Sequence, residues 1–146
     1  MSTVADVLAK KGHDVACATV DEMVFDAVRS MNDLRIGAVV VVDANRHVVG
    51  MFTERDVLRR VVGEERSPRS TPVGEVMTSE VAYCRLETEI DEAKGVMAKY
   101  RIRHMPVCAE EGKLLGIISI GDLNAWDADG QVETIHWLNE YIAGRV

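Results

Sequence analysis

The sequence predicts an α/β (α+β) fold of two βαββα repeats packed with pseudo-two-fold symmetry, followed by a C-terminal amphipathic helix. Three observations predict this fold. Residues 15–56 align without gaps on residues 81–122, and both copies show the same order of strand-like and helix-like patterns. A βαββα unit of about 60 residues buries too little surface to be stable alone, so the two copies are expected to share a core.

The duplication is clear in the aligned residues. At an offset of 66 residues the two copies share nine identities in 42 positions, where ordinary composition gives roughly three. The preceding segments, TVADVL at 3–8 and PVGEVM at 72–77, also correspond, with three additional residues in the first copy. We therefore place repeat 1 at residues 1–66, repeat 2 at residues 67–128 and the C-terminal helix at residues 129–146.

Each copy is expected to begin with a short strand and a helix. The apolar segments VACA at 15–18 and VAYC at 81–84 predict the strands. Apolar residues recur at spacings of three and four over 24–34 and over 90–100, which predicts an amphipathic helix in each copy.

A hairpin and a second helix complete each copy. The segments IGAVVVVD and HMPVCAE predict the first hairpin strands, and the former is so uniformly apolar that both of its faces should be covered. The second strands are HVVGMF and KLLGII, and the final helices should begin at Thr53 and Ser119. The polar segment 63–71 reads as a linker. Residues 130–144 predict an amphipathic helix that packs on its own core or on a second subunit.

Composition and charge exclude several classes of function. The net charge of −7 disfavours broad nucleic-acid binding, which requires a basic face. No apolar run approaches the roughly 18 residues of a membrane span, and the N-terminal residues lack the apolar core of a signal peptide. Three widely spaced cysteines and four scattered histidines suggest neither a disulfide framework nor a metal site. We expect a cytoplasmic protein that binds neither membranes nor nucleic acids.

The segments GMFTERD and GIISIGD each place a hydroxyl residue three positions before an aspartate. Thr53 with Asp56, and Ser119 with Asp122, fit the helix capping box, in which both side chains satisfy backbone N–H groups of the first turn. Taken singly, a helix cap is the commoner meaning of such a pattern.

The same spacing also suits a nucleotide. A hydroxyl at a helix N-terminus helps to bind phosphate, and an acid one turn further in can accept hydrogen bonds from a ribose. Gly121 relieves crowding beside Asp122. Two copies therefore predict two related clefts, the Thr53 cleft (Thr53 and Asp56) and the Ser119 cleft (Ser119 and Asp122).

Positive charge is expected to distinguish the two clefts. The second copy has RIRH at 101–104 just before its first hairpin strand, whereas the first copy has RIGA there. Such charge runs are usually solvated, but Arg103 and His104 are candidates to contact phosphate. In the first copy Arg55 can compensate for the missing charge. This asymmetry predicts that the Ser119 cleft holds phosphate more firmly.

The duplicated unit, the RHMPV segment and the twin G-h-h-[ST]-x-x-D segments (h, apolar) resemble a tandem pair of CBS domains, or Bateman module. The resemblance covers about residues 3–127. The whole chain is similar to stand-alone, signal-transduction-type CBS proteins. It implies regulatory binding of adenosine-containing ligands such as AMP, ADP, ATP, NAD(H) or S-adenosylmethionine. In that family the hydroxyl and the aspartate of the motif contact phosphate and ribose.

The resemblance also assigns residues to each cleft. It implies that adenine in the Ser119 cleft rests on residues of the first copy, with two basic residues at the phosphate: Val15, Ala16, Ile36, Gly37, Arg103 and His104. It implies that adenine in the Thr53 cleft rests on Val81, Ala82 and Ile102. The first copy has Val40 where the second has Pro106, and Gly37–Ala38 offers no side-chain donors, which weakens the expectation for the Thr53 cleft.

The leading hypothesis is an adenine-nucleotide sensor that relays the occupancy of its clefts to an effector protein that the sequence does not identify. It requires no cofactor, and the adenine nucleotide is its regulatory ligand. Paired CBS domains usually dimerise through their helices, so the resemblance also implies a homodimer. No catalytic constellation is present, which predicts that the protein is not an enzyme. The alternative is a ligand-independent dimeric scaffold whose S/T-x-x-D segments are only helix caps.

Overall fold

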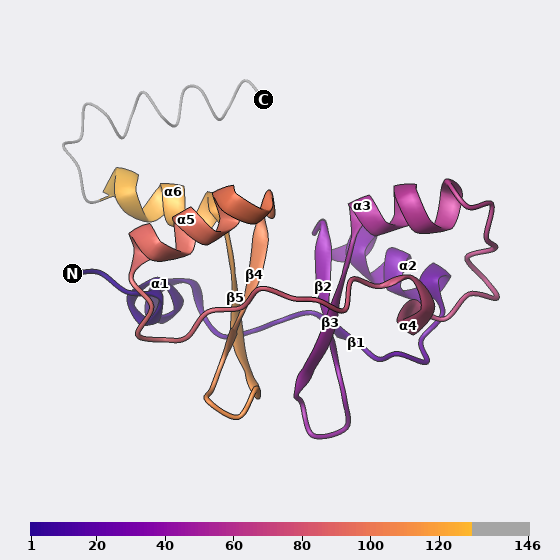
Figure 1. The fold of residues 1–146 in the computed structure, drawn as a ribbon, viewed down its shortest axis with the longest axis horizontal. Coiled ribbons are helices and arrows are strands. Elements are labelled where there is room, and N and C mark those ends of the chain that lie inside the picture. The colour runs from indigo at the N-terminus through magenta and orange to yellow at the C-terminus, as the bar shows by residue number, and fades with distance from the viewer. Residues whose placement is uncertain (130–146) are drawn as a thin grey trace.

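The computed structural model describes residues 1–129 of the 146-residue chain. Two similar halves lie side by side, each with a small sheet covered by helices (Figure 1). The predicted fold class, two βαββα repeats of mixed helix and strand, is confirmed. The C-terminal helix predicted beyond residue 129 lies outside the described residues.

The elements follow the predicted order, with an additional short helix near the start of each repeat. The first copy contains α1 (Val4–Lys11), β1 (Cys17–Ala18), α2 (Val24–Leu34), β2 (Ala38–Val42), β3 (Val48–Thr53), α3 (Glu54–Asp56) and the π-helix η1 (Val57–Val62). The second copy contains α4 (Val73–Val76), α5 (Ile90–Tyr100), β4 (His104–Cys108), β5 (Leu114–Ser119) and α6 (Ile120–Asp129). None of these helices combines the length and the apolar character needed to cross a bilayer.

The first strands are shorter than the sequence predicts. Of residues 15–18, only Cys17 and Ala18 form β1, which pairs in parallel with β2. In the second copy, residues 81–84 make a single parallel bridge, from Cys84 to Val107. The first sheet therefore has the order β1-β2-β3, whereas the second is the hairpin β4-β5.

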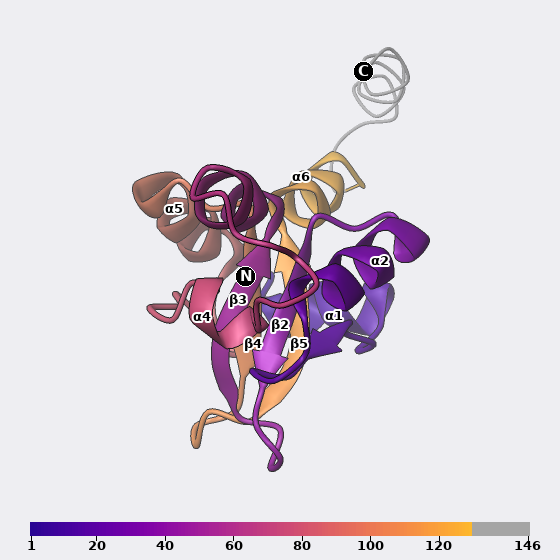
Figure 2. The same ribbon diagram turned by 90° about the vertical axis from the view of Figure 1, so that its right-hand side faces the viewer.

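The two halves exchange their first helices. Val4, Val7 and Leu8 of α1 are buried in the core of the second half, beside α5, β4 and β5. Val73 and Val76 of α4 are buried in the core of the first half. In Figures 1 and 2, α1 accordingly lies next to β5. Each packed half therefore contains a helix that belongs, by sequence, to the other copy.

A third core joins the two sheets. Along β2, alternate side chains enter different cores, because successive residues of a strand point to opposite faces. Val39 and Val41 face the helices of the first half, whereas Ala38, Val40 and Val42 pack toward the second sheet. This arrangement confirms that the apolar strand of the first copy is covered on both faces.

Candidate functional site

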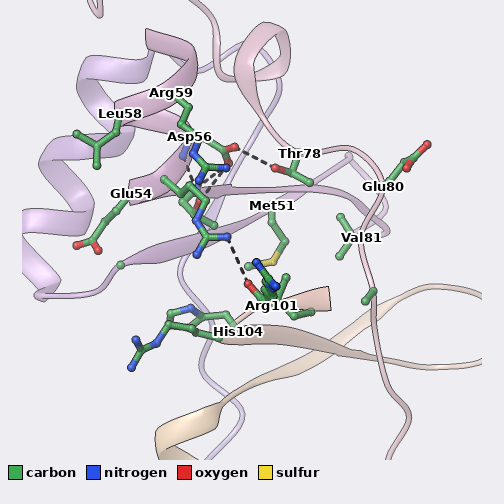
Figure 3. A pocket seen from close by; sticks show the side chains of 16 residues that line it. Met51, Glu54, Asp56, Leu58, Arg59, Thr78, Glu80, Val81, Arg101 and His104 are labelled. Carbon is green, nitrogen blue, oxygen red and sulfur yellow. Dashed lines mark hydrogen bonds between the residues drawn. The ribbon is translucent and has the colours of Figure 1, made fainter. Parts of the chain in front are cut away.

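A cavity of about 460 Å³ lies between the two repeats (Figure 3). Its volume falls in the range of small-molecule sites, roughly 300–1,000 Å³. The first copy contributes eight lining residues: Gly37, Met51, Thr53, Glu54, Arg55, Asp56, Leu58 and Arg59. The second copy contributes eight more: Thr78, Glu80, Val81, Ala82, Arg101, Ile102, Arg103 and His104. This cavity is the Thr53 cleft.

The capping box at the end of β3 shapes one wall of the cavity. The backbone N–H of Thr53 donates to Oδ2 of Asp56 at 3.0 Å, and the N–H of Asp56 donates to the Thr53 hydroxyl at 3.3 Å. These reciprocal bonds hold the first turn of α3 in place. Asp56 is only 5% exposed, which is unusual for a carboxylate and requires partners within the protein.

Thr78 supplies the second partner of Asp56. Its hydroxyl donates to Oδ1 of Asp56 at 3.0 Å, as Figure 3 shows. The backbone of Thr78 is fixed by two hydrogen bonds to Met51, of 2.8 and 2.9 Å. Arg60 lies 3.8 Å from the same carboxylate oxygen. The segment of repeat 2 that follows α4 thus completes the polar wall of the Thr53 cleft.

The cavity is rich in charged side chains of both signs, in a chain of net charge −7. Four arginines line it, against the carboxylates of Glu54, Asp56 and Glu80. Arg55 donates from Nη1 to the carbonyl of Arg101 at 3.3 Å, which joins the two copies across the cavity. Arg101 caps the C-terminus of α5 in the left-handed conformation, with φ of 55°. The equivalent Arg35 caps α2 in the same way, with φ of 56°. That turn directs the chain into the segment that carries Arg103 and His104.

His104 lies at the start of β4, on the side of the cavity opposite Asp56 (Figure 3). Partial burial is the main cause that lowers the pKa of this imidazole, and the charges of Lys11 and Arg103 lower it further. Asp122 and Glu54 act in the opposite direction. Charged residues of both motifs therefore influence the pKa of His104, since Glu54 belongs to one motif and Asp122 to the other.

The rest of the wall is apolar. Val81, Ala82 and Ile102 are partly buried and line the cavity beside Met51. Such a surface can accept the face of a planar ring, while the arginines and the Thr53 hydroxyl lie within the same cavity. The Thr53 cleft therefore combines an apolar wall with anion-binding groups.

The Ser119 motif forms the same capping box in different surroundings. The N–H of Ser119 donates to Oδ2 of Asp122 at 2.8 Å, and the N–H of Asp122 donates to the Ser119 hydroxyl at 3.0 Å. The ammonium group of Lys11 lies 2.6 Å from the same Oδ2 and 2.8 Å from the carbonyl oxygen of Ile117. Asp122 is thus paired closely with a lysine, whereas Asp56 accepts a hydrogen bond from Thr78 and has its cation, Arg60, at 3.8 Å.

The structure groups the expected residues differently from the sequence prediction. Those that meet at the Thr53 cleft are Gly37, Thr53, Arg55, Asp56, Val81, Ala82, Ile102, Arg103 and His104. Those that do not line this cavity are Val15, Ala16, Ile36, Ser119, Gly121 and Asp122. Val15, Ala16 and Ile36 instead pack against the buried cores.

The sequence analysis assigned Arg103, His104 and Gly37 to the Ser119 cleft, whereas in the structure all three line the Thr53 cleft. The reason lies in the β4–β5 ladder, where His104 is the partner of Ser119 and Arg103 accepts a bond from the N–H of Ile120. The strand start therefore sits between the two motifs. The expectation that the Ser119 cleft holds phosphate more firmly depended on Arg103 and His104, and it stays a prediction.

Sequence reasoning also missed residues that lie ahead of the first-strand segment of each repeat. Thr78 and Glu80 line the Thr53 cleft, and Lys11 reaches Asp122. The correspondence of 3–8 with 72–77 contains the signal, because its continuation aligns Ala9 with Thr78 and Lys11 with Glu80. Among residues 1–129, no cluster of three or more His, Cys, Asp or Glu side chains forms a possible metal site.

The sequence matches the profile of the CBS domain at residues 4–63 and again at residues 73–129. The chain belongs to the CBS-domain family. The mitochondrial CBS domain-containing protein CBSX3 of Arabidopsis thaliana is 37% identical to it over 151 residues, which cover 98% of this chain and 73% of that protein. CBS pairs are ligand-binding regulatory modules and are generally non-catalytic.

Solved structures agree with this assignment. A signal-transduction protein with CBS domains from Burkholderia ambifaria is 41% identical, with a TM-score of 0.82 over 90% of this chain and 98% of that chain. The CBS domain pair of protein MJ0100, in complex with 5′-methylthioadenosine and S-adenosyl-L-methionine, has a TM-score of 0.79 over 90% of this chain and 99% of that chain. That pair is 20% identical, so its likeness shows the fold alone.

Proposed function

We propose that the protein is a regulatory module that binds a phosphate-bearing adenosine ligand, such as AMP, ADP, ATP or NAD(H), in the Thr53 cleft. The observation that carries this proposal is the cavity itself. Around the Thr53–Asp56 motif it has an apolar wall and four arginines, two from each repeat. S-adenosylmethionine carries a sulfonium and an ammonium charge, so the arginines favour the nucleotides over it.

The cleft offers a partner for each part of such a ligand. Adenine would pack on Val81, Ala82 and Ile102, and a ribose hydroxyl would donate to Asp56. An ionised carboxylate offers about four acceptor positions, and the bonds from Thr53 and Thr78 leave room for one more. The arginines would bind phosphate, because charge-assisted hydrogen bonds to phosphate are the strong ones. The Thr53 hydroxyl would join them by turning its single proton from Oδ2 of Asp56 to the phosphate.

The position of the cleft between the two copies would allow its occupancy to be relayed to an effector protein. A ligand that contacts both copies changes their relation only by its difference in affinity for the two arrangements. The readout is then made by an effector protein, from a homodimer of this chain, and no catalytic step is involved. Three free cysteines accord with a reducing compartment such as the cytoplasm.

A second candidate is a ligand-independent dimeric scaffold. One observation favours it: both oxygens of Asp56 already accept hydrogen bonds within the protein, so the motif is complete as a helix cap. Stability measurements separate the two functions, because a scaffold gains nothing from nucleotide.

The test is thermal unfolding of the purified protein with AMP, ADP, ATP, NAD, NADH and S-adenosylmethionine, with GTP as the control. A ligand at 100 times its dissociation constant adds about 2.7 kcal/mol of stability, which raises Tm by several degrees. The rise should shrink in Asp56→Asn and in Arg103→Ala. Arg29→Ala is the matched control, because Arg29 lies near Phe25 on α2 and does not line the cavity.

Two results would contradict the proposal. The absence of any rise at millimolar concentrations would leave the scaffold. A rise that persists unchanged in Asp56→Asn and Arg103→Ala would place the ligand elsewhere on the protein.

A further inference from the structure

The end of α1 delivers a positive charge to the Ser119 motif. α1 is anchored by Val4, Val7 and Leu8, which are buried in the core of the second half. Leu8 also packs on β5 so closely that a Cβ at Gly116 would lie 2.8 Å from Cδ1 of Leu8. Lys11 is the last residue of this helix, so its side chain starts from a fixed position beside β5.

The ammonium group of Lys11 is held by two acceptors. It lies 2.6 Å from Oδ2 of Asp122 and 2.8 Å from the carbonyl oxygen of Ile117. Its side chain is 33% exposed and that of Asp122 is 25% exposed, so the pair lies at the surface and is only partly shielded from water. An ion pair at the protein surface contributes little, but partial burial and a second acceptor strengthen this one.

The same place in the other half is occupied differently. By the alignment of the segments before the repeats, Lys11 corresponds to Glu80. Glu80 lines the open cavity, whereas Lys11 is bonded to the aspartate of the motif. The edge of the neighbouring strand also differs, because Met51 pairs with the backbone of Thr78 while Leu115 and Ile117 are approached by the side chains of His13 and Lys11.

We propose that Lys11 is an intramolecular occupant of the Ser119 cleft, so that each chain binds one nucleotide, in the Thr53 cleft, and Lys11 determines this stoichiometry. The inference rests on the proposed function. A ribose at Asp122 would have to displace the ammonium group from Oδ2 and from the carbonyl of Ile117. The ammonium group would then lose both acceptors that hold it in the protein, which costs free energy.

The experiment is equilibrium dialysis with radiolabelled ATP and, separately, AMP, up to 100 times the dissociation constant of the first site. Wild-type protein should bind one mole per mole of chain, and Lys11→Met, which keeps the aliphatic stem, should bind two. Asp56→Asn should lose the wild-type site, whereas the double variant Lys11→Met/Asp56→Asn should bind one mole, in the Ser119 cleft. Lys11→Arg should behave as wild type.

Lys94→Ala is the matched control, because it removes a lysine from an ion pair with Asp127 of α6, outside both motifs. It should bind one mole. Two moles bound by wild type, or one mole still bound by Lys11→Met, would overturn the inference and leave the proposed function intact. Zero moles bound by wild type would overturn the proposed function and this inference with it. Circular dichroism of each variant confirms that the binding measured is that of folded protein.

Discussion

The two S/T-x-x-D motifs build the same capping box and then differ in what meets the aspartate. Asp56 receives the hydroxyl of Thr78 and borders an open cavity of about 460 Å³. Asp122 receives the ammonium group of Lys11 and does not line that cavity. The difference shows that the motif determines only the local turn. The residue that meets each aspartate comes from the segment ahead of the first-strand residues of repeat 1 or repeat 2, Lys11 in one case and Thr78 in the other.

The charge of the clefts differs for a related reason. Positions 55 and 103 carry arginine, whereas their equivalents in the other copy, Gly121 and Gly37, carry no side chain. Both arginines line the Thr53 cleft, because the start of β4 lies between the two motifs. One cleft has therefore gained the basic residues of both copies. Four further predictions test this contrast, in order of decreasing effect.

The largest effect is expected for Thr78→Val, which removes the hydroxyl partner of Asp56 at nearly constant volume. A hydrogen bond to a charged group contributes about 1.5–3 kcal/mol, so urea denaturation should show a loss of about that size. The nucleotide-induced rise in Tm should fall with it. Thr88→Val is the control, because the Thr88 hydroxyl accepts only a neutral N–H bond, from Arg85. Equal losses in the two variants would mean that Asp56 does not depend on Thr78.

The glycines before the motifs should respond unequally. A Cβ at Gly50 would lie 2.6 Å from the sulfur of Met77 and 2.9 Å from the carbonyl oxygen of Thr78, which is backbone. A Cβ at Gly116 would meet only the side chain of Leu8. Gly50→Ala should therefore cost about 1–3 kcal/mol, and Gly116→Ala less, by urea denaturation. The opposite order would show that Leu8 is held more rigidly than the Thr78 backbone.

Removing the two capping hydroxyls separates structure from binding. Thr53→Ala and Ser119→Ala should each lower the free energy of unfolding by about 0.5–2 kcal/mol, because each loses an N-cap. Only Thr53→Ala should also reduce the thermal response to ATP. If Ser119→Ala reduced that response equally, the Ser119 cleft would be occupied in the wild-type protein.

The smallest effect concerns His104, which lies between the motifs. Its pKa is lowered in the folded protein, chiefly by burial, so the unfolded chain binds a proton more readily. The contribution of neutral, buried His104 to the free energy of unfolding is therefore complete above the pKa of the unfolded state, near 6.5. It is lost as the pH falls from there toward the pKa of the folded state. Urea denaturation at pH 7.5 and pH 5.5 should show a larger acid-induced loss for wild type than for His104→Gln.

The control for His104 is His47→Gln, an exposed histidine beside Asp43. Identical pH dependence in wild type and His104→Gln would show that burial of the imidazole does not contribute measurably.

Much of the fold could be predicted from the sequence because repetition and periodicity act locally. The helices at 24–34 and 90–100, the hairpins and the capping boxes at Thr53 and Ser119 appear where the patterns place them. The first strands were overestimated, since an apolar run of four residues does not specify how many of them pair. The π-helical turn after Asp56 had no signal in the residue pattern.

The sequence by itself determined the duplication, the order of elements and the local geometry of both motifs, because these depend on residues close together in the chain. Only the tertiary structure decided which half each first helix joins, which cleft receives Arg103 and His104, and that Lys11 meets Asp122. Lys11 and Asp122 are 111 residues apart. A contact over that distance depends on how two cores pack, and no local pattern records it.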